Sequence, residues 1–487
     1  MMKVAFQNRI LVIGCGSVSQ CFLPLLLRHV TTPPEQITVM DFVDNRARIA
    51  DVLQAGVHYV IDGITRENLH AKLSEFVSRG DLIIDVAYNI DCSEILEWCH
   101  AHQIMYINTS VEEWEPYKDA PNIPPIHRTL YARQMKLRRQ LRQWPEKGVT
   151  AVVDHGANPG LVSHFTKEGL RDIALKLLAE KPDDPRADEL QDALCAKNFA
   201  KIAQLTGVKV IHISERDTQI TNRPKEVNEF VNTWSIEGFY EEGIAPAEMG
   251  WGTHERMLPV GAHIHSHGPR NQICLAQMGI QTKVRSWVPC GEIVGMVIRH
   301  GEAFTISDLL TVREENMPVY RPTVHYAYCP CDSAIVSLYE LEMRQFALQE
   351  RLRILEDDIV SGRDELGVLL MGHDFQSWWI GSLLSIEEAR RLVPHQNATT
   401  LQVACSVLGA VAWMINHPQE GVCVPDQLPY EDILTWAKPY LGEFVSRPVN
   451  WNPLMNRKDI ELFSKFHQFS PKFTDDDMWQ FTTFQVS

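Results

Sequence analysis

The sequence of 487 residues lacks an excess of positive charge and any long apolar run. Its 62 acidic side chains outnumber 46 basic ones, which gives a formal net charge of −16. A nucleic-acid binder needs a basic surface to neutralise phosphates, so we predict no nucleic-acid partner. Polar or small residues at Cys405, Ser406 and Gly409 interrupt the longest apolar stretch, residues 403–415. That stretch is too short to span a bilayer, and we predict no membrane attachment.

The chain also lacks paired cysteines, and we expect no secretion signal. Its 11 cysteines are scattered and form no Cys-x-x-Cys pair, and no small-residue cleavage site follows the first apolar run. Dispersed thiols in such a chain are typical of reduced cysteine, which predicts a cytoplasmic protein. His263, His265 and His267 alternate at a spacing compatible with zinc, but no acidic or cysteine ligand stands at a characteristic offset. We predict no metal site.

The first 160 residues alternate short β-type runs with segments of helical length. The runs at 10–13, 37–41, 57–61, 81–87, 104–108 and 150–153 are expected to be strands. Continuous apolar strands separated by helices indicate a parallel sheet covered on both faces. We predict an α/β protein whose N-terminal domain, residues 1–156, is a Rossmann-type parallel sheet.

After Gly160 the pattern changes to alternating runs, among them 208–213, 294–299 and 324–328, which are typical of antiparallel strands with one exposed face. We predict a second, α+β domain for substrate binding over residues 157–374. A segment within 375–420 is expected to complete the first domain. The proline-rich residues 421–487 are expected to form a tail that packs on the core.

A basic segment, residues 131–144, is expected to form a helix. Its cations include Arg133 and Lys136 and could mimic a nucleic-acid contact. Because the helix belongs to an acidic α/β protein, we expect these side chains to form a solvated face.

A glycine-rich turn predicts a dinucleotide site. Gly14-Cys-Gly16-Ser-Val-Ser19 follows the first strand and opens the first helix, with serine in place of the third glycine of the fingerprint. Asp41 ends the second strand, where a carboxylate bonds the ribose hydroxyls and repels a 2′-phosphate, so NAD is favoured over NADP. A flavodoxin-like fold with a glycine turn and no nucleotide is the alternative. The expected cofactor contacts are Gly14, Gly16, Ser17, Val18, Asp41, Ala87, Asn89, Asn108, Thr109, Asn158 and Pro159.

Three segments together resemble one family. The turn Ile-Gly-Cys-Gly-Ser-Val at 13–18, the junction Val-Val-Asp-His-Gly-Ala-Asn-Pro-Gly at 152–160 and Thr-Trp-Ser at 233–235 are similar to those of bacterial homospermidine synthases, relatives of the saccharopine dehydrogenase-like enzymes. The resemblance covers the whole chain. It implies a homodimeric transferase that joins two putrescines into sym-homospermidine and releases ammonia, with NAD as a recycled hydride carrier. It leaves open whether spermidine is also a donor.

The resemblance also implies site residues. Putrescine is a dication, so its site needs carboxylates at the ends and aromatic faces for cation–π contact. By position, the family's catalytic groups fall on Trp234, Glu215, Glu242, His300 and Glu302, and substrate-binding groups on Asn158, Asp91, Glu113 and Asp374. The neighbouring Glu237 and Glu241 are expected to lie on a solvated turn.

Three other functions remain open. A saccharopine dehydrogenase-like oxidoreductase acting on an amino-acid imine would also use NAD, but it needs convergent arginines to clamp carboxylates. A non-catalytic nucleotide-sensing module would bind NAD without turnover. Zinc hydrolysis would use the three alternating histidines.

Overall fold

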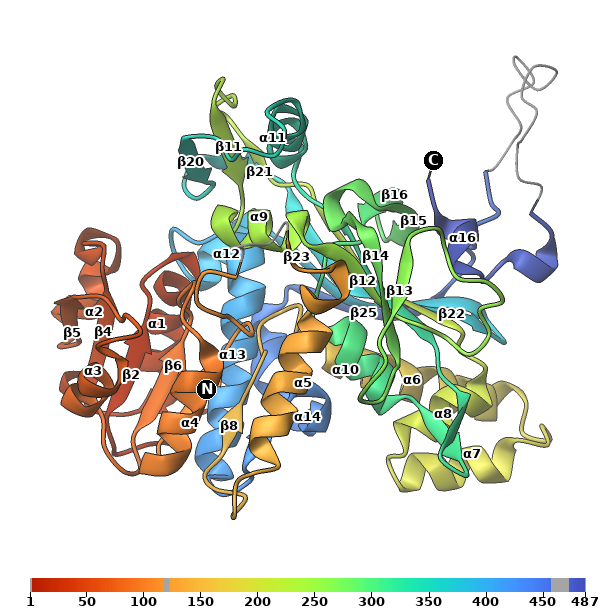
Figure 1. Cartoon of the computed structure of the whole chain (residues 1–487), viewed down its shortest axis with the longest axis horizontal. Coiled ribbons are helices and arrows are strands. Elements are labelled where there is room, and N and C mark those ends of the chain that lie inside the picture. The colour runs from red at the N-terminus through yellow and green to blue at the C-terminus, as the bar shows by residue number, and fades with distance from the viewer. Residues whose placement is uncertain (1, 117–121, 457–472, 487) are drawn as a thin grey trace.

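The apolar runs of the N-terminal part form a parallel sheet, as the sequence predicts (Figure 1). The computed structural model describes residues 2–116, 122–456 and 473–486. The strands of this sheet are β2 (Ile10–Ile13), β4 (Ile37–Asp41), β5 (His58–Ile61), β6 (Leu82–Asp85), β7 (Met105–Asn108), β8 (Ala151–Val152) and β24 (Val422–Cys423). They lie in the order β24-β8-β7-β6-β2-β4-β5, all parallel. β2, β6 and β7 are buried along their whole length, which explains their continuous apolar character.

Helices connect these strands. They are α1 (Ser17–His29), α2 (Ala50–Gln54), α3 (Leu69–Phe76), α4 (Cys92–His102) and α5 (Leu130–Leu141). Two of them begin at a polar cap: the Asp91 side chain accepts from backbone amides at the start of α4, and Thr129 does so at the start of α5. Such caps satisfy amides that have no partner within the helix.

The second sheet is larger and mixed. Its strands are β9 (Val210–Asp217), β12 (Pro246–Gly250), β13 (Ala262–Ile264), β14 (Gln272–Met278), β15 (Lys283–Val288), β16 (Gly291–Met296), β19 (Thr323–Cys329), β22 (Arg363–His373), β23 (Gln376–Ser385) and β25 (Glu443–Val449). The order is β13-β14-β12-β19-β9-β22-β23-β25, and the β15–β16 hairpin joins at β19. The sequence predicts exposed antiparallel strands here, but β9 and β19 pair in parallel and are almost fully buried, because they are central in the sheet.

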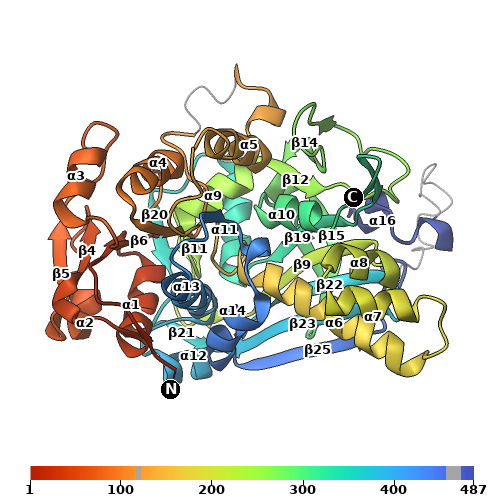
Figure 2. The same cartoon turned by 90° about the horizontal axis from the view of Figure 1, so that it is seen from below.

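Helices pack on this second sheet and around it. They are α6 (Leu161–Glu180), α7 (Ala187–Cys195), α8 (Phe199–Thr206), α9 (Ile236–Ile244), α10 (Glu302–Leu309), α11 (Asp332–Met343), α12 (Ile386–Leu392), α14 (Tyr430–Ala437) and α16 (Phe481–Phe484). α6 crosses β22 and β23 at close range (Figure 2). A Cβ at Gly169 would lie 2.9 Å from the side chains of Leu370 and Ile380, so this approach requires glycine.

The helix α13 (Ala398–Asn416) lies between the two sheets (Figure 1). It packs on α1 of the first sheet and contacts β22 of the second. Among the described residues, α13 is the helix whose length and apolar composition would allow it to cross a membrane. However, 89% of its most apolar stretch is buried inside the protein. Burial of this kind is typical of a central core helix.

The chain after α13 differs from the predicted tail. It adds β24 to the parallel sheet beside β8, and β25 to the second sheet beside β23. Pro448 is tolerated in this strand because β25 is an edge strand, where one side needs no ladder hydrogen bond.

Candidate active site

The glycine turn leaves open space at the start of α1. Gly14 has a φ of +92°, and a Cβ there would lie 3.0 Å from the backbone nitrogen of Ala87. A Cβ at Gly16 would meet nothing within 4 Å, so this side of the turn is free for a ligand. Ser17 and Val18 form the first turn of α1, whose N-terminal amides attract anions. The turn therefore fits a pyrophosphate.

Asp41 stands at the carboxyl end of β4, beside the turn. Its carboxylate accepts hydrogen bonds from the backbone amides of Cys15, at 2.5 Å, and Val43, at 2.8 Å. These bonds hold the carboxylate at the sheet edge, which fits the predicted contact with a ribose.

Two predicted cofactor contacts are engaged within the chain. The Asn108 side chain is buried, accepts from the backbone amide of Asp154 at 2.7 Å and donates to the Tyr106 hydroxyl at 3.1 Å. The side-chain oxygen of Asn89 accepts from the backbone amide of Glu115 at 2.8 Å. Both amides therefore tie loops together. Their contact with a cofactor stays a prediction, as do those of Ala87 and Thr109.

Glu215 is the centre of a buried polar group on β9. Its Oε2 accepts a hydrogen bond from Asn158 Nδ2 at 3.0 Å and another from the Tyr326 hydroxyl. Asn158 is joined to Pro159 by a cis peptide bond, and it connects the junction after β8 with the second sheet. Burial raises the pKa of Glu215 to about 7.

His300 joins two further carboxylates. Its Nε2 lies 2.9 Å from Glu242 Oε2, and its Nδ1 lies 3.3 Å from Glu302 Oε1. Burial alone lowers the pKa of His300, but Glu242 and Glu302 more than offset this and raise it well above its ordinary value. β16 ends at Met296, and Glu302 is the first residue of α10.

Aromatic rings connect these groups. Trp234 Nε1 donates to the Tyr328 hydroxyl at 2.8 Å. The rings of Tyr328 and Tyr326 are stacked with centroids 5.2 Å apart, and the His300 ring lies 4.4 Å from that of Tyr326. A continuous aromatic surface thus runs from Trp234 to His300, beside Glu215.

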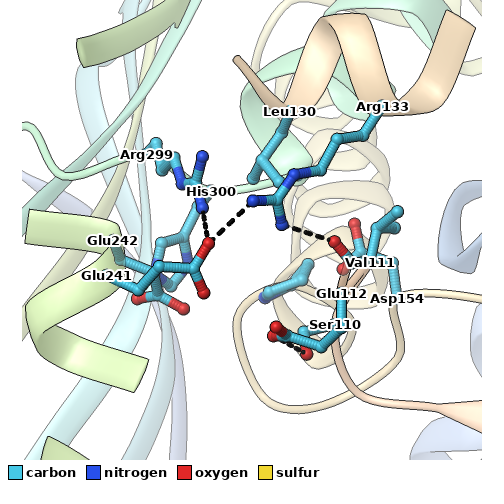
Figure 3. A pocket seen from close by; sticks show the side chains of 12 residues that line it. Ser110, Val111, Glu112, Leu130, Arg133, Asp154, Glu241, Glu242, Arg299 and His300 are labelled. Carbon is cyan, nitrogen blue, oxygen red and sulfur yellow. Dashed lines mark hydrogen bonds and ion pairs between the residues drawn. The ribbon is translucent and has the colours of Figure 1, made fainter. Parts of the chain in front are cut away.

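A small pocket, partly open to solvent, adjoins this group between α5, α9 and the segment after β7 (Figure 3). Its lining residues are Ser110, Val111, Glu112, Leu130, Arg133, Asp154, Pro159, Glu241, Glu242, Arg299, His300 and Gly301. Both domains of the sequence prediction contribute to it. Asp154 lines this cavity and is absent from the predicted site, although it stands directly after a strand in the 152–160 junction.

Two arginines in the cavity wall converge on Glu241. Arg133 Nη2 lies 2.7 Å from Glu241 Oε1, and Arg299 bonds the same oxygen (Figure 3). Two predictions are therefore wrong: Arg133 is not on a solvated face, since it is 7% exposed, and Glu241 is not on a solvated turn, since it is 2% exposed. Buried charges must be paired. The sequence around each residue did not indicate that Arg133 and Glu241 are buried and paired.

Asp374, predicted as a substrate contact, lies away from this group, and its contact with substrate stays a prediction. It follows β22 and pairs with Arg186, at 2.5 Å, and with Lys181, at 3.7 Å. Glu215 pairs in the sheet with Leu366, near the opposite end of β22. The buried Asp364 lies at that end instead, and burial together with Glu215 raises its pKa well above the ordinary value.

Asp91 and Glu113 are held by the basic helix. Lys136 pairs with Asp91 at 3.1 Å and with Glu113 at 3.3 Å, and Glu113 also pairs with Arg133. Glu113 directly follows the cavity residue Glu112. A role for Asp91 and Glu113 at the approach to the cavity stays a prediction.

The alternating histidines pack against an aromatic residue. The ring of His265 stacks on Tyr131 with centroids 3.7 Å apart, and the Tyr131 hydroxyl donates to the carbonyl of His267. Burial lowers the pKa of His265 to about 4. In the part of the chain that the structure describes, no group of three or more His, Cys, Asp or Glu side chains could hold a metal ion.

Comparisons with known proteins identify relatives over the full chain. Two family models match: the saccharopine dehydrogenase NADP binding domain over residues 10–152, and the saccharopine dehydrogenase C-terminal domain over residues 156–449. Homospermidine synthase of Blastochloris viridis is 38% identical over 97% of this chain and 96% of that protein. Homospermidine synthase of Mesorhizobium japonicum is 36% identical over 98% and 96%.

Solved structures agree with these sequence matches. Homospermidine synthase from Legionella pneumophila in complex with NAD matches with a TM-score of 0.87 at 36% identity, and the match covers 100% of this chain and 99% of that one. Apo saccharopine dehydrogenase from Saccharomyces cerevisiae matches with a TM-score of 0.51 at 11% identity, over 91% and 100% of the two chains, which indicates a shared fold.

Proposed function

The chain belongs to the homospermidine synthase family of saccharopine dehydrogenase-like proteins, and on this premise we propose that it condenses two putrescines into homospermidine and releases ammonia. One observation carries the proposal. Glu215, Glu242 and Glu302 surround the aromatic surface, and among the described residues none of them pairs with a lysine or arginine. His300 supplies one positive charge, which Glu242 and Glu302 share, so the three carboxyl groups together still need a cation from outside the chain. Putrescine supplies one at each end.

The arginines of the cavity wall argue against an amino-acid imine as substrate. Arg133 and Arg299 do converge, as a carboxylate clamp requires, but they converge on the chain's own Glu241. A substrate carboxylate would have to displace Glu241 and would meet the neighbouring Glu242. The site therefore favours a diamine over an amino acid.

The cofactor is NAD, and the residues present fit it. The space above Gly16, the N-terminus of α1 and the carboxylate of Asp41 suit the pyrophosphate and the adenosine ribose. The carboxylate of Asp41 would repel a 2′-phosphate. When bound, NAD supplies a hydride acceptor for one amine-bearing carbon and later the hydride donor for the coupled imine.

The residues of the chain bind the charged ends of the substrate and transfer protons. An ammonium must lose a proton before its carbon can be oxidised, and the second putrescine must attack as a neutral amine. Glu215 is suited to accept and return such protons, because its pKa lies near neutral pH. Glu242 and Glu302 hold the charged ends and fix the reacting carbon in place.

Trp234 stabilises the cationic iminium over its ring by a cation–π contact of about 1–2 kcal/mol. Its ring is fixed by the hydrogen bond to Tyr328. Burial of Glu215, His300 and Glu302 limits the entry of water, which would hydrolyse the imine to an aldehyde.

Location, assembly and the second donor belong to the same proposal. All 11 cysteines are free, which supports a reducing, cytoplasmic setting. We propose a homodimer, and spermidine as a second donor because it carries the same aminobutyl end.

A product assay tests the proposed function. The purified protein is incubated with putrescine and a catalytic amount of NAD⁺, and amines are separated by chromatography. We expect homospermidine and ammonia in equal amounts without net NADH. NADH formed in proportion to putrescine consumed, with no coupled amine, would contradict it; so would NAD binding with no turnover.

A further inference from the structure

Asp154 occupies a conformation that its surroundings must enforce. Its φ is +70°, in the left-handed region that residues other than glycine adopt infrequently. Asn108 holds this turn at both ends: its side-chain oxygen accepts from the amide of Asp154, and its carbonyl accepts from the amide of His155. The strained turn places the carboxyl group in the cavity wall, where it is 2% exposed.

The Asp154 carboxyl group packs directly on Gly301. A Cβ at Gly301 would lie 1.9 Å from Asp154 Oδ2, so only glycine allows this approach. Gly301 separates His300 from Glu302. Asp154 Oδ2 is buried without a hydrogen-bond partner, and both oxygens of the fully buried Glu302 lack one too, although Oε1 lies 3.3 Å from His300. The carboxyl groups of Asp154 and Glu302 thus lie beside a single imidazole, that of His300.

The charges around Asp154 are mostly negative. Glu302 and His300 face it from the segment that begins α10, Glu242 from α9, and Glu112 from the segment after β7. The guanidinium groups of Arg133 and Arg299 line the same cavity but are bonded to Glu241. Burial and Glu302 together raise the pKa of Asp154 to about 8.

We propose that Asp154 is a proton-holding member of the substrate site: it keeps one proton while the site lacks substrate, and loses this proton to solvent when an ammonium group of the diamine enters. The entering charge replaces the proton, so the diamine keeps both of its own and the site stays near neutrality. This inference rests on the proposed function, because the incoming cation is the diamine. It assigns Asp154 to substrate binding, and explains why position 301 is glycine.

Calorimetric titration of putrescine tests the proposal. The protein is loaded with NADH, so that bound putrescine is not oxidised, and titrated at pH 7 in buffers of different ionisation enthalpy. We expect the wild type to release about one proton more per putrescine than Asp154→Asn. Glu255→Gln is the matched control. Burial also raises the pKa of Glu255 to about 7, but its carboxylate is bonded to Thr323 and the amide of Phe481 and should leave the proton count unchanged.

A spectroscopic measurement on the wild type covers the case in which Asp154→Asn does not fold. Infrared difference spectra should show the loss of a protonated carboxyl band when putrescine is added. Binding of putrescine with no lost band, or with the same proton release in the wild type and Asp154→Asn, would overturn the inference and leave the proposed function intact. Failure of putrescine to bind at all would overturn the proposed function, and the inference with it.

Discussion

Glu241 and Glu242 are neighbours on α9, and their carboxylates lie in opposite electrostatic settings. Glu241 is buried between Arg133 and Arg299, which come from segments on either side of it in the chain. Among the described residues, Glu242 forms an ion pair with His300, which also pairs with Glu302. The first carboxylate is neutralised within the protein and joins α5 to the second sheet. The second belongs to a group with more negative charge than the chain compensates.

This difference separates structural acids from substrate-binding acids. An ion pair that is complete within the protein is costly to break, because each remaining partner is a buried, unpaired charge. An acid without such a partner is a weak contributor to stability until a ligand supplies the cation. The predictions below follow from this distinction.

The largest expected effect is on stability. Glu241→Gln removes the carboxylate that two buried guanidinium groups share, of which Arg133 keeps its pair with Glu113, and should lower the free energy of unfolding by about 3–5 kcal/mol. Glu242→Gln, the matched control one residue away, should lower it by less than about 1 kcal/mol. Urea unfolding of the two variants measures both values. Equal losses would show that the two carboxylates do not differ as described.

Next in size is an effect on catalysis. Trp234→Ala removes the ring that stabilises the iminium and should lower kcat/KM roughly 5- to 30-fold, equivalent to about 1–2 kcal/mol. Trp234→Phe keeps an aromatic face and loses the hydrogen bond to Tyr328, so its loss should be much smaller. Steady-state kinetics with putrescine separates the two. The same loss of kcat/KM in both variants would mean that the Trp234 ring contributes packing alone and does not stabilise the iminium.

Stability should depend on pH in opposite directions for the two kinds of acid. Glu215 binds its proton more tightly when folded, at a pKa of about 7 against an ordinary 4.5, so its contribution falls as pH rises between these values. Burial tends to raise the pKa of Glu241, but Arg299 and Arg133 lower it below 4.5, so its contribution is lost only as pH falls through that lowered pKa.

Thermal unfolding between pH 5 and 8 measures this dependence. The wild type without substrate should lose stability toward pH 8, and putrescine should restore it most strongly there. Glu215→Gln should flatten the profile, because it removes the titrating group. A profile that Glu215→Gln leaves unchanged would contradict the role of Glu215.

The smallest effect is expected at Asp374. Its pairs with Arg186 and Lys181 are partly exposed, and such pairs are worth about 0–1 kcal/mol. Asp374→Asn should therefore leave kcat/KM for putrescine unchanged. A substantial loss of activity would return Asp374 to the substrate site.

Short sequence motifs were enough to predict the βα units of the N-terminal sheet. Gly14, Gly16 and Asp41 stand at fixed positions in a βα unit, so their neighbours in sequence are also their neighbours in space. The positions of Glu215, Glu242 and His300 came from family resemblance, and the structure brings His300 against Glu242. Their spacing in sequence alone contains no such information.

The errors and omissions involve contacts between distant segments. Glu241 is buried because Arg133 and Arg299 reach it from 108 and 58 residues away. Asp364, rather than Asp374, lies near Glu215 because of the pairing register of β9 with β22. The position of the Asp154 carboxyl group depends on its contact with Gly301, which the hydrophobic periodicity of the sequence does not indicate. Burial of a charged residue is a property of the assembled fold.

Binding of a diamine and a monoamine tests the central claim most directly. The NADH-loaded protein is titrated with putrescine and with n-butylamine, which matches its length but has one ammonium group. If carboxylates without internal partners hold both ends of the substrate, putrescine should bind at least about tenfold more tightly, which corresponds to 1.4 kcal/mol. Equal affinities would contradict the claim that these acids form a site for a dication.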